Sequence, residues 1–322
     1  MNRRFLSILA ACSLFVACGT ENGSSTPKAV FIIVDGIAAD VIESTPTPNL
    51  DDIAEIGGYA RAFVGGEAGG ASESPTVSAV GYNSLLTGTW ANKHNVYDNN
   101  VDSPNYAYWD IFRIAKAHNP SLRTAIFSTW TDNRTKLLGD GLAEAGGSKL
   151  DYYADGYELD TARFPHDDTG EYIRKIDEVV VAEAAQHILE NGPDLSWVYL
   201  EHTDWIAHEV GDSPEQTAAV RGVDEQVGII WAAIKARQAA HDEDWLIVVT
   251  TDHGRDAETG KDHGGQSERE RTTWIVTNSN RLNAHFDEIP GIVDILPSIA
   301  THLNISIPAP VQAQLDGQSF ID

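Results

Sequence analysis

The chain has 322 residues, and its hydrophobic and charged fractions of 42% and 22% fit one large α/β domain, because no long polar linker interrupts the middle. Its formal net charge of −26 excludes docking on a nucleic-acid backbone, which needs clustered Lys and Arg. The same charge repels anionic substrates at long range, so specificity for a phosphate group would have to come from metals bound locally.

The first residues are typical of an export signal. Arg3 and Arg4 precede an apolar stretch over 5–16 that is too short to span a bilayer. Ala17 before Cys18 resembles the processing site of bacterial lipoproteins, and we favour this site over the alternative at Cys12. The sequence therefore predicts an exported protein, periplasmic or held on the outer membrane or cell surface by a lipid on Cys18.

These boundaries divide the chain into three parts. We expect residues 1–18 to be the signal peptide, 19–27 a flexible tether, and 28–322 a single folded domain. Both cysteines lie in the signal peptide, so the folded domain offers neither a disulfide nor a thiol nucleophile.

Strand and helix patterns alternate along the folded domain. Buried β-strands are predicted over 28–34, 123–128, 195–201, 245–251 and 273–277, and helices over 108–118, 172–190 and 214–238. This order predicts a three-layer αβα sandwich around a large, mainly parallel sheet. In such sheets ligands bind beyond the carboxyl ends of the strands. Asp35, Asp204 and Asp252 each come just after a predicted strand, so they are expected at one edge of the sheet.

Acidic and imidazole side chains gather in the same places. Asp204 and His208 stand four residues apart, His253 follows Asp252, and His263 precedes two glycines. Each motif alone has a plainer interpretation as a turn, a solvated helix pair or a loop. Together with Asp35 they supply three carboxylates and three imidazoles, which suits two divalent ions, Zn²⁺ first and Mn²⁺ as the alternative.

Such a site favours chemistry at phosphorus. Three carboxylates balance most of the charge of two divalent ions and leave about one positive charge for a phosphate oxyanion. Since no cysteine is available, the nucleophile would be a hydroxyl, and residues 74–88 offer Thr76, Ser78, Ser84 and Thr87. A helix starting at such a residue would direct backbone N–H groups at the phosphate, although a helix N-cap is the plainer role for a serine there.

These motifs resemble those of the alkaline phosphatase superfamily, and most closely the type I phosphodiesterase/nucleotide pyrophosphatase group. In that superfamily the nucleophile stands nine residues before a Thr-Gly pair, which here points from Thr87 and Gly88 to Ser78. His94 and Asn99 fall at the offsets of the group's next His and of an Asn that supports a phosphate oxygen. The resemblance implies that Ser78 is the nucleophile and that Asn99 contacts the substrate phosphate.

The resemblance also assigns the metal ligands. One ion would be bound by Asp35, Ser78, Asp252 and His253, and the other by Asp204, His208 and His263.

The chain departs from the group at several positions. Ser78 is followed by Ala79, Val80 and Gly81 rather than by an aromatic residue, Pro and Asn, and the sulfatase signature of Pro and Arg after the nucleophile is absent. The position of a third-metal Glu falls at Tyr199, so a three-metal site is not expected.

Substrate contacts are the least defined part of the prediction. Arg134 follows the strand at 123–128 and is a candidate phosphate contact, or else a solvated loop charge. Trp130 and Trp205 are candidates for an aromatic slot around a leaving group, or else packing residues.

The sequence thus predicts a two-metal phosphoric ester hydrolase that works through a serine phospho-enzyme. Phosphodiesters or nucleotide pyrophosphate bonds are the favoured substrates, with alkaline phosphomonoesterase activity as the alternative. A non-catalytic, metal-stabilised binding lipoprotein is the alternative from another class. The expected partner is a small phosphate ester or nucleotide, with no nucleic-acid docking and with membrane contact only through the lipid anchor.

Overall fold

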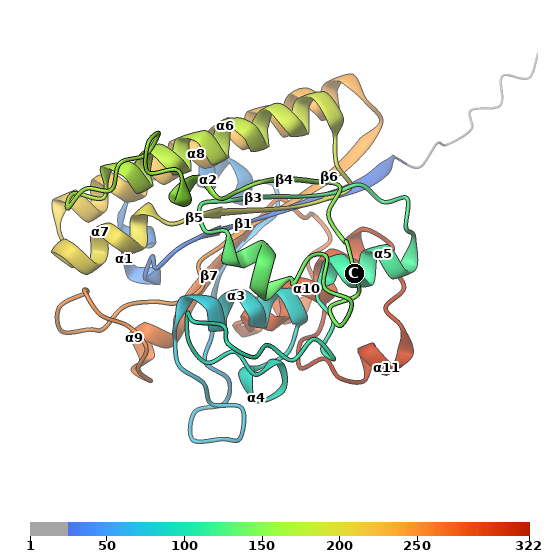
Figure 1. Cartoon of the computed structure of the whole chain (residues 1–322), viewed down its shortest axis with the longest axis horizontal. Coiled ribbons are helices and arrows are strands. Elements are labelled where there is room, and N and C mark those ends of the chain that lie inside the picture. Colours follow the sequence, from blue (N-terminus) through green and yellow to red (C-terminus); the bar gives the residue numbers. More distant parts are fainter. Residues whose placement is uncertain (1–24) are drawn as a thin grey trace, which may run out of the picture.

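A seven-stranded sheet, in the order β2-β7-β6-β1-β5-β3-β4, runs through the computed structural model, which describes residues 25–322 (Figure 1). The strands are β1 (Thr26–Val34), β2 (Gly58–Phe63), β3 (Thr124–Ser128), β4 (Tyr152–Ala154), β5 (Leu195–Leu200), β6 (Glu243–Thr250) and β7 (Thr272–Thr277). β1, β3, β4, β5 and β6 pair in parallel, whereas β7 pairs antiparallel with both β6 and β2.

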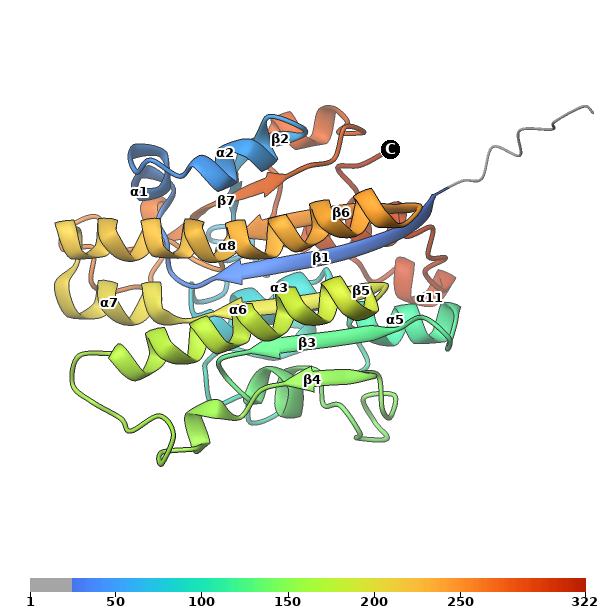
Figure 2. The same ribbon diagram turned by 90° about the horizontal axis from the view of Figure 1, so that it is seen from above.

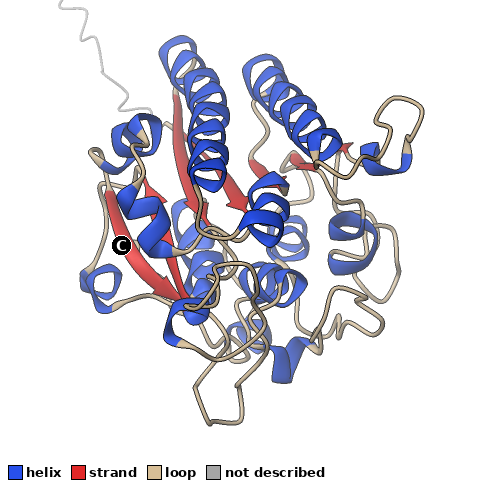
Figure 3. Ribbon diagram, turned by 90° about the vertical axis from the view of Figure 1, so that its left-hand side faces the viewer, coloured by secondary structure: helices blue, strands red, loops and turns tan. Residues whose placement is uncertain are grey.

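Helices cover both faces of the sheet (Figures 1 and 2). One face carries α1 (Ala39–Ser44), α2 (Pro48–Ala54), α6 (Glu171–Asn191), α7 (His202–Val210) and α8 (Pro214–Ala240). The other carries α3 (Ser78–Thr87), α4 (Ala91–His94), α5 (Ile111–His118), α10 (Ile295–His302) and α11 (Ala309–Gln312). Shorter turns are α9 (Glu268–Arg271), a π-helical turn (Asn133–Leu137) and 3₁₀ turns at Tyr157–Leu159, Ala284–Glu288 and Ile292–Asp294. Figure 3 shows the strands between the two helical layers, so the predicted three-layer α/β fold is confirmed.

The central strand β1 explains why the sheet needs both layers. Its residues Ala29 to Val34 are all fully buried. Ala29, Phe31 and Ile33 pack with the α3, α5 and α10 side, while Val30, Ile32 and Val34 pack with the α6 and α8 side. A strand that is apolar on both faces is fully buried only when a layer of helices packs on each face. The continuous apolar sequence of β1 predicted this arrangement.

All five predicted strands are present, with ends that differ by at most two residues from the prediction. β2 and β4 were not predicted. β2 is an edge strand on which exposed residues alternate with partly buried ones over its first four positions, and β4 has only three residues, so neither gives a long apolar run. The predicted helix at 108–118 starts later, at Ile111, because the Asp110 side chain accepts a hydrogen bond from the backbone N–H of Arg113 and caps the helix.

The start of the chain is only partly within the described residues. The predicted signal peptide and Cys18 lie outside them. β1 begins at Thr26, so the last two residues of the predicted tether belong to the sheet. Within 25–322, no helix combines the length and the apolar character that crossing a membrane requires.

Parallel pairing brings three strand ends together. In register, Ile33 of β1 lies beside Tyr199 of β5 on one side and Thr250 of β6 on the other. The residues that follow these strands, Asp35 and Asp252 among them, therefore emerge at one edge of the sheet.

The packing of Phe31 provides a test of this core. Its ring stacks on Trp197 with a centroid distance of 5.8 Å and is fully buried. We predict that Phe31→Ala lowers the free energy of unfolding by ~3–5 kcal/mol in urea denaturation, because it leaves a cavity between the sheet and α5. Ile229→Ala, at a residue that is 53% exposed on α8, should change it by less than ~0.5 kcal/mol. Equal effects of the two substitutions would contradict the described packing.

Candidate metal centre

The first cluster at the sheet edge consists of Asp35, Asp252 and His253. His253 Nε2 lies 3.4 Å from Asp35 Oδ1 and 3.3 Å from Asp252 Oδ2. All three side chains are at most 2% exposed. Asp35 directly follows β1, and Asp252 and His253 lie in the loop after β6, so the sheet itself sets their separation.

A second cluster adjoins it and contains Asp204, His208 and His263. Asp204 and His208 share a face of α7, as their spacing predicted, and His208 Nε2 lies 3.4 Å from Asp204 Oδ2 and 3.1 Å from His263 Nε2. Asp204 Oδ1 is 3.8 Å from the Nε2 atoms of both His253 and His263. The rings of His253 and His263 stack at 3.7 Å between centroids, so the two clusters form one continuous site.

The oxygen atoms of the first cluster fit a divalent cation. Asp35 Oδ1 and Asp252 Oδ2 are buried and have no hydrogen-bond partner within residues 25–322. Two buried carboxylates side by side cannot both be charged unless a cation compensates them. The fit therefore rests on these unpartnered oxygens together with the neighbouring imidazole nitrogen, a donor set suited to Zn²⁺ or Mn²⁺.

Burial sets the protonation of these groups in the absence of a cation. Burial, with the charge of Asp204 in addition, raises the pKa of Asp35 to about 7, and burial next to Asp35 raises the pKa of Asp252 well above its usual value. Burial also lowers the pKa values of His253 and His263, which keeps both imidazoles neutral. Neutral imidazoles offer a lone pair at once, whereas the two acids must release protons when a cation binds.

Two tyrosines hold the other oxygen of Asp35. Tyr199 donates a hydrogen bond of 2.7 Å to Asp35 Oδ2, and the Tyr82 hydroxyl donates to the same atom. This arrangement leaves Oδ1 to face His253. Sequence reasoning missed both tyrosines, although Tyr82 stands one helical turn after Ser78 and Tyr199 lies beside β1.

Ser78 is the one of the four candidate hydroxyls that faces the cluster. It is the first residue of α3, and its Oγ lies 3.4 Å from His253 Nε2. The Thr76 hydroxyl instead donates to Gly265 O and accepts from Gly264 N, at 2.9 Å and 3.0 Å. Ser84 and Thr87 donate to backbone carbonyls of their own helix, as expected for hydroxyls that play a structural role.

A glycine allows α3 to approach the cluster. A Cβ atom at Gly81 would lie 2.6 Å from the backbone oxygen of Asp252, well inside contact distance. The first turn of α3 therefore rests directly on the loop that carries Asp252 and His253, and this contact fixes Ser78 beside His253.

A cavity of about 440 Å³ opens next to Ser78. Its lining comprises Asp35, Ser78, Tyr82, Asn99, Asn100, Asp102, Trp130, Asp132, Lys136, Tyr199, Glu201 and Asp204. Asn99 is one of these lining residues, and its Oδ1 accepts from the backbone N–H of Ala79 at 2.9 Å, which leaves its Nδ2 group as a donor. Trp130 also lines the cavity, as one interpretation of the sequence suggested.

Arg134 and Trp205, for which the sequence left both a substrate contact and a plainer role open, are not among the residues that line this cavity. Arg134 pairs with Asp155 at 2.5 Å and lies over the ring of Tyr153. The π-helical turn at Asn133–Leu137 directs Lys136 to the cavity instead, and a prediction by spacing cannot anticipate such a turn. Trp205 packs against Gly170, where a Cβ atom would meet its ring at 2.2 Å.

His94 serves the packing of α3 rather than the site. Its Nε2 lies 3.1 Å from Ser84 Oγ, and its Nδ1 accepts from the backbone N–H of Val96. Complete burial lowers the pKa of His94 to about 3, so the ring stays neutral.

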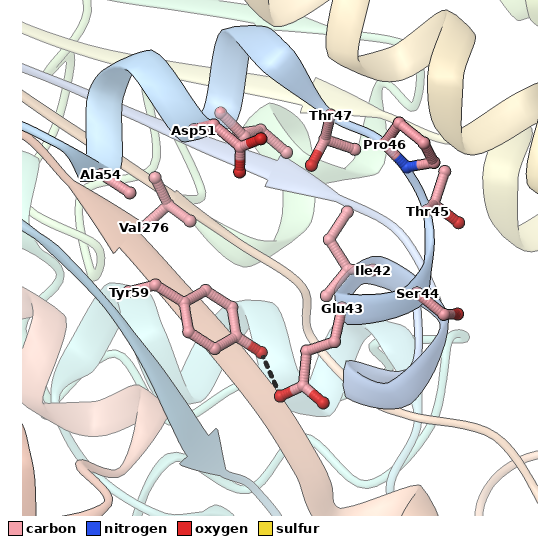
Figure 4. A pocket seen from close by; sticks show the side chains of 11 residues that line it. Ile42, Glu43, Ser44, Thr45, Pro46, Thr47, Asp51, Ala54, Tyr59 and Val276 are labelled. Carbon is pink, nitrogen blue, oxygen red and sulfur yellow. Dashed lines mark hydrogen bonds between the residues drawn. The ribbon is translucent and has the colours of Figure 1, made fainter.

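A different hollow, of about 450 Å³, lies beside α1 and α2 (Figure 4). Its best-defined polar contact joins Tyr59 to Glu43 at 2.8 Å. None of the residues predicted for the site lines it, so the chemistry belongs to the cavity at Ser78.

Arg255 is the charged residue of the centre that sequence reasoning missed. It is 1% exposed, and its guanidinium pairs with Asp204. Burial alone would raise the pKa of Asp204, but Arg255 and the neighbouring histidines outweigh it and hold that pKa below its usual value. The signal was present in the sequence, since Arg255 stands only three residues after Asp252.

Comparison with known proteins agrees with this architecture. Residues 29–298 match the model of the family described as type I phosphodiesterase/nucleotide pyrophosphatase. The chain is similar to the bis(5'-adenosyl)-triphosphatase enpp4 of Xenopus laevis, with 22% identity over 268 residues that make up 77% of this chain and 52% of that protein. The chain thus spans about half the length of this curated relative.

Solved structures share the fold. Murine ectonucleotide pyrophosphatase/phosphodiesterase 5 superposes with a TM-score of 0.59 at 15% identity, covering 89% of this chain and 99% of that one. An inactive variant of the murine protein was solved in complex with AMP. BT1596, described as a 2-O GAG sulfatase, gives a TM-score of 0.59 at 12% identity and covers 91% of this chain and 73% of that one. At such identities these likenesses establish the fold and leave the reaction to the site.

Metal binding should stabilise the protein strongly. We predict that Zn²⁺ at 100 times its dissociation constant from the first cluster adds ~2.7 kcal/mol to the free energy of unfolding, measured by thermal or urea denaturation. Chelation of the ion with EDTA should remove this gain. Asp252→Asn should abolish most of the gain while leaving the metal-free protein at least as stable, because it replaces a buried acid by a neutral amide. Asp102→Asn, in the same cavity but outside both clusters, is the matched control and should keep the gain. A full Zn²⁺ effect in Asp252→Asn would rule out the first cluster as a metal site.

Proposed function

Because the chain belongs to the type I phosphodiesterase/nucleotide pyrophosphatase family, we propose that it is a metal-dependent hydrolase of phosphodiester or nucleotide pyrophosphate bonds, with Ser78 as its nucleophile. The observation that carries this proposal is the position of Ser78 Oγ, 3.4 Å from His253 Nε2, in a cluster where two carboxylate oxygens have no hydrogen-bond partner among residues 25–322. A hydroxyl at the start of a helix and next to a cation site suits attack on phosphorus.

The metal centre would hold two divalent ions, Zn²⁺ or, as the alternative, Mn²⁺. Asp35, Asp252, His253 and Ser78 would bind one ion, and Asp204, His208 and His263 the other. When bound, these ions would lower the pKa of the attacking hydroxyl and stabilise charge on the attacking and leaving oxygens.

The remaining steps follow from the residues around the cavity. Ser78 loses its proton to solvent, its Oγ forms a bond to phosphorus, and the bond from phosphorus to the leaving oxygen breaks. The Nδ2 group of Asn99 and the backbone N–H of Ser78 would donate to the phosphate oxygens, whereas the N–H of Ala79 is held by Asn99 Oδ1. A water molecule then attacks the phosphoserine on phosphorus, releases the product and restores Ser78, so each cycle consumes one water.

The charges around the cavity favour diesters over monoesters. Apart from the proposed metal ligands, Asp102 and Asp132 are the acidic lining residues that count as charges, because burial raises the pKa of the third, Glu201, well above its usual value. Lys136 is the single basic residue among the lining residues. Lys136 is already paired with Asp132 at 2.8 Å. Because a monoester dianion carries one more negative charge than a diester, this lining disfavours it more strongly. Trp130 offers an apolar surface for the leaving group. The AMP complex of the murine neighbour favours a nucleotide among the candidate substrates.

We also propose that the protein acts outside the cytoplasm. The apolar stretch after Arg3 and Arg4 is typical of an export signal, and Ala17-Cys18 suits lipid attachment after processing. Mass spectrometry of the membrane-extracted protein would test this by detecting an N-terminal diacylated cysteine.

Removal of the Ser78 hydroxyl tests the nucleophile. We predict that Ser78→Ala lowers the turnover of a nucleotide p-nitrophenyl ester and of bis(p-nitrophenyl) phosphate by roughly 10³-fold or more, because the covalent step is lost. Ser84→Ala is the matched control, since its hydroxyl bonds within the same helix. The metal content of both variants, measured by mass spectrometry, should match that of the wild type to within one bound ion. Full activity of Ser78→Ala would transfer the role to Thr76, and faster hydrolysis of p-nitrophenyl phosphate by the wild type would favour the phosphomonoesterase.

Lys136 and Arg134 provide a test of the substrate cavity. We predict that Lys136→Ala raises KM for the nucleotide ester roughly tenfold, because the one cation of the cavity lining is lost. Arg134→Lys, which keeps a charge opposite Asp155, should leave KM and kcat unchanged. If steady-state kinetics instead show a raised KM for Arg134→Lys and an unchanged KM for Lys136→Ala, Arg134 rather than Lys136 would be the residue that contacts the phosphate.

A further inference from the structure

Arg255 is a buried cation built into one half of the metal centre. Its Nη2 donates to Asp204, to Oδ1 and to the backbone oxygen, the latter at 3.0 Å. Its Nε donates to Gly36 O at 3.0 Å, and its Nη1 donates to Lys261 O at 3.1 Å. The guanidinium thus joins the loop after β1, helix α7 and the loop before His263.

The backbone leaves room for this guanidinium. Gly36 has φ of +66°, and a Cβ atom there would lie 2.3 Å from Arg255 Nη2 and 2.6 Å from Asp204 Oδ1. A side chain at this position would displace either the guanidinium or the carboxylate. The ion pair is therefore fixed from three sides rather than being one conformation of a mobile arginine.

The two halves of the centre consequently differ in charge. In the first cluster, Asp35 and Asp252 each have a buried oxygen without a hydrogen-bond partner within the described residues. In the second, the single carboxylate of Asp204 already has one oxygen paired with Arg255, and its Oδ2 faces His208 at 3.4 Å. An arginine keeps its charge at every accessible pH. Two ionised carboxylates in the first cluster give −2, whereas Asp204 and Arg255 together give zero.

From this difference we infer that Arg255 makes the two metal positions unequal, so that the Asp204–His208–His263 position binds its divalent ion more weakly than the Asp35–Asp252–His253 position. This inference rests on the proposed two-metal function. In this arrangement the ion at the Asp35–Asp252–His253 position stays bound, while the ion at the Asp204–His208–His263 position exchanges with the solution. The concentration of the free metal ion then sets the fraction of the protein that carries both ions. Arg255 is thus a positioning residue that acts through Asp204.

Calorimetric titration of the metal-free, full-length protein with Zn²⁺ tests the inference. We expect two binding steps in the wild type, the second weaker by about tenfold or more. Arg255→Met has a similar length without the charge and should tighten the second step about tenfold while leaving the first unchanged. Arg255→Lys keeps a positive charge and should keep the second step weak. The first step serves as the internal control for folding.

The outcomes separate this inference from the proposed function. Two equal steps in the wild type, or an unchanged second step in Arg255→Met, would overturn the inference whatever the activity. If Arg255→Met also fails to show the first binding step, the wild type and Arg255→Lys decide the question. Two unequal steps in both of these proteins would support the inference. A tight second step in Arg255→Lys would overturn it. Unequal steps without hydrolysis of any ester would leave the inference standing and refute the proposed function.

Discussion

Two buried carboxyl groups, to which the described part of the chain supplies no charged partner, are the constraint around which the site is organised. Asp35 and Asp252 leave the ends of neighbouring strands and are at most 2% exposed. Burying such a pair is unfavourable unless both are protonated or a cation joins them. The neighbouring imidazole of His253, which burial keeps neutral, completes a donor set that suits a divalent cation.

The packed sheet holds the two carboxyl groups close together although their proximity is unfavourable. β1, β5 and β6 are buried on both faces, so their ends cannot shift without disturbing two layers of core. Tyr82 and Tyr199, from a helix and a strand, tie one oxygen of Asp35. The remaining oxygen is thereby presented in a fixed direction, which is the preorganisation that metal sites and their nucleophiles require.

The shared fold does not by itself decide the reaction. Proteins described as a nucleotide pyrophosphatase/phosphodiesterase and as a sulfatase superpose on this chain with the same TM-score of 0.59. What separates such proteins is the site: the identity of the nucleophile, the charges around the cavity and the surroundings of each ligand. Here the candidates for those features are a serine on α3, a cavity with more acidic than basic residues, and an arginine beside Asp204.

The sequence by itself determined the layers of the fold and which carboxylates meet at one edge of the sheet. Continuous apolar runs are buried on both faces wherever they form, and residues after parallel strands must meet at one edge, so the meeting of Asp35, Asp204 and Asp252 followed from chain order alone. Tertiary structure decided what depends on the direction of single side chains. The π-helical turn brought Lys136 rather than Arg134 to the cavity, hydrogen bonds to the 264–265 backbone occupied Thr76 and left Ser78 facing His253, and the space at Gly36 admitted Arg255. Such outcomes depend on contacts between segments far apart in the chain, and neither periodicity nor spacing within one segment carries that information.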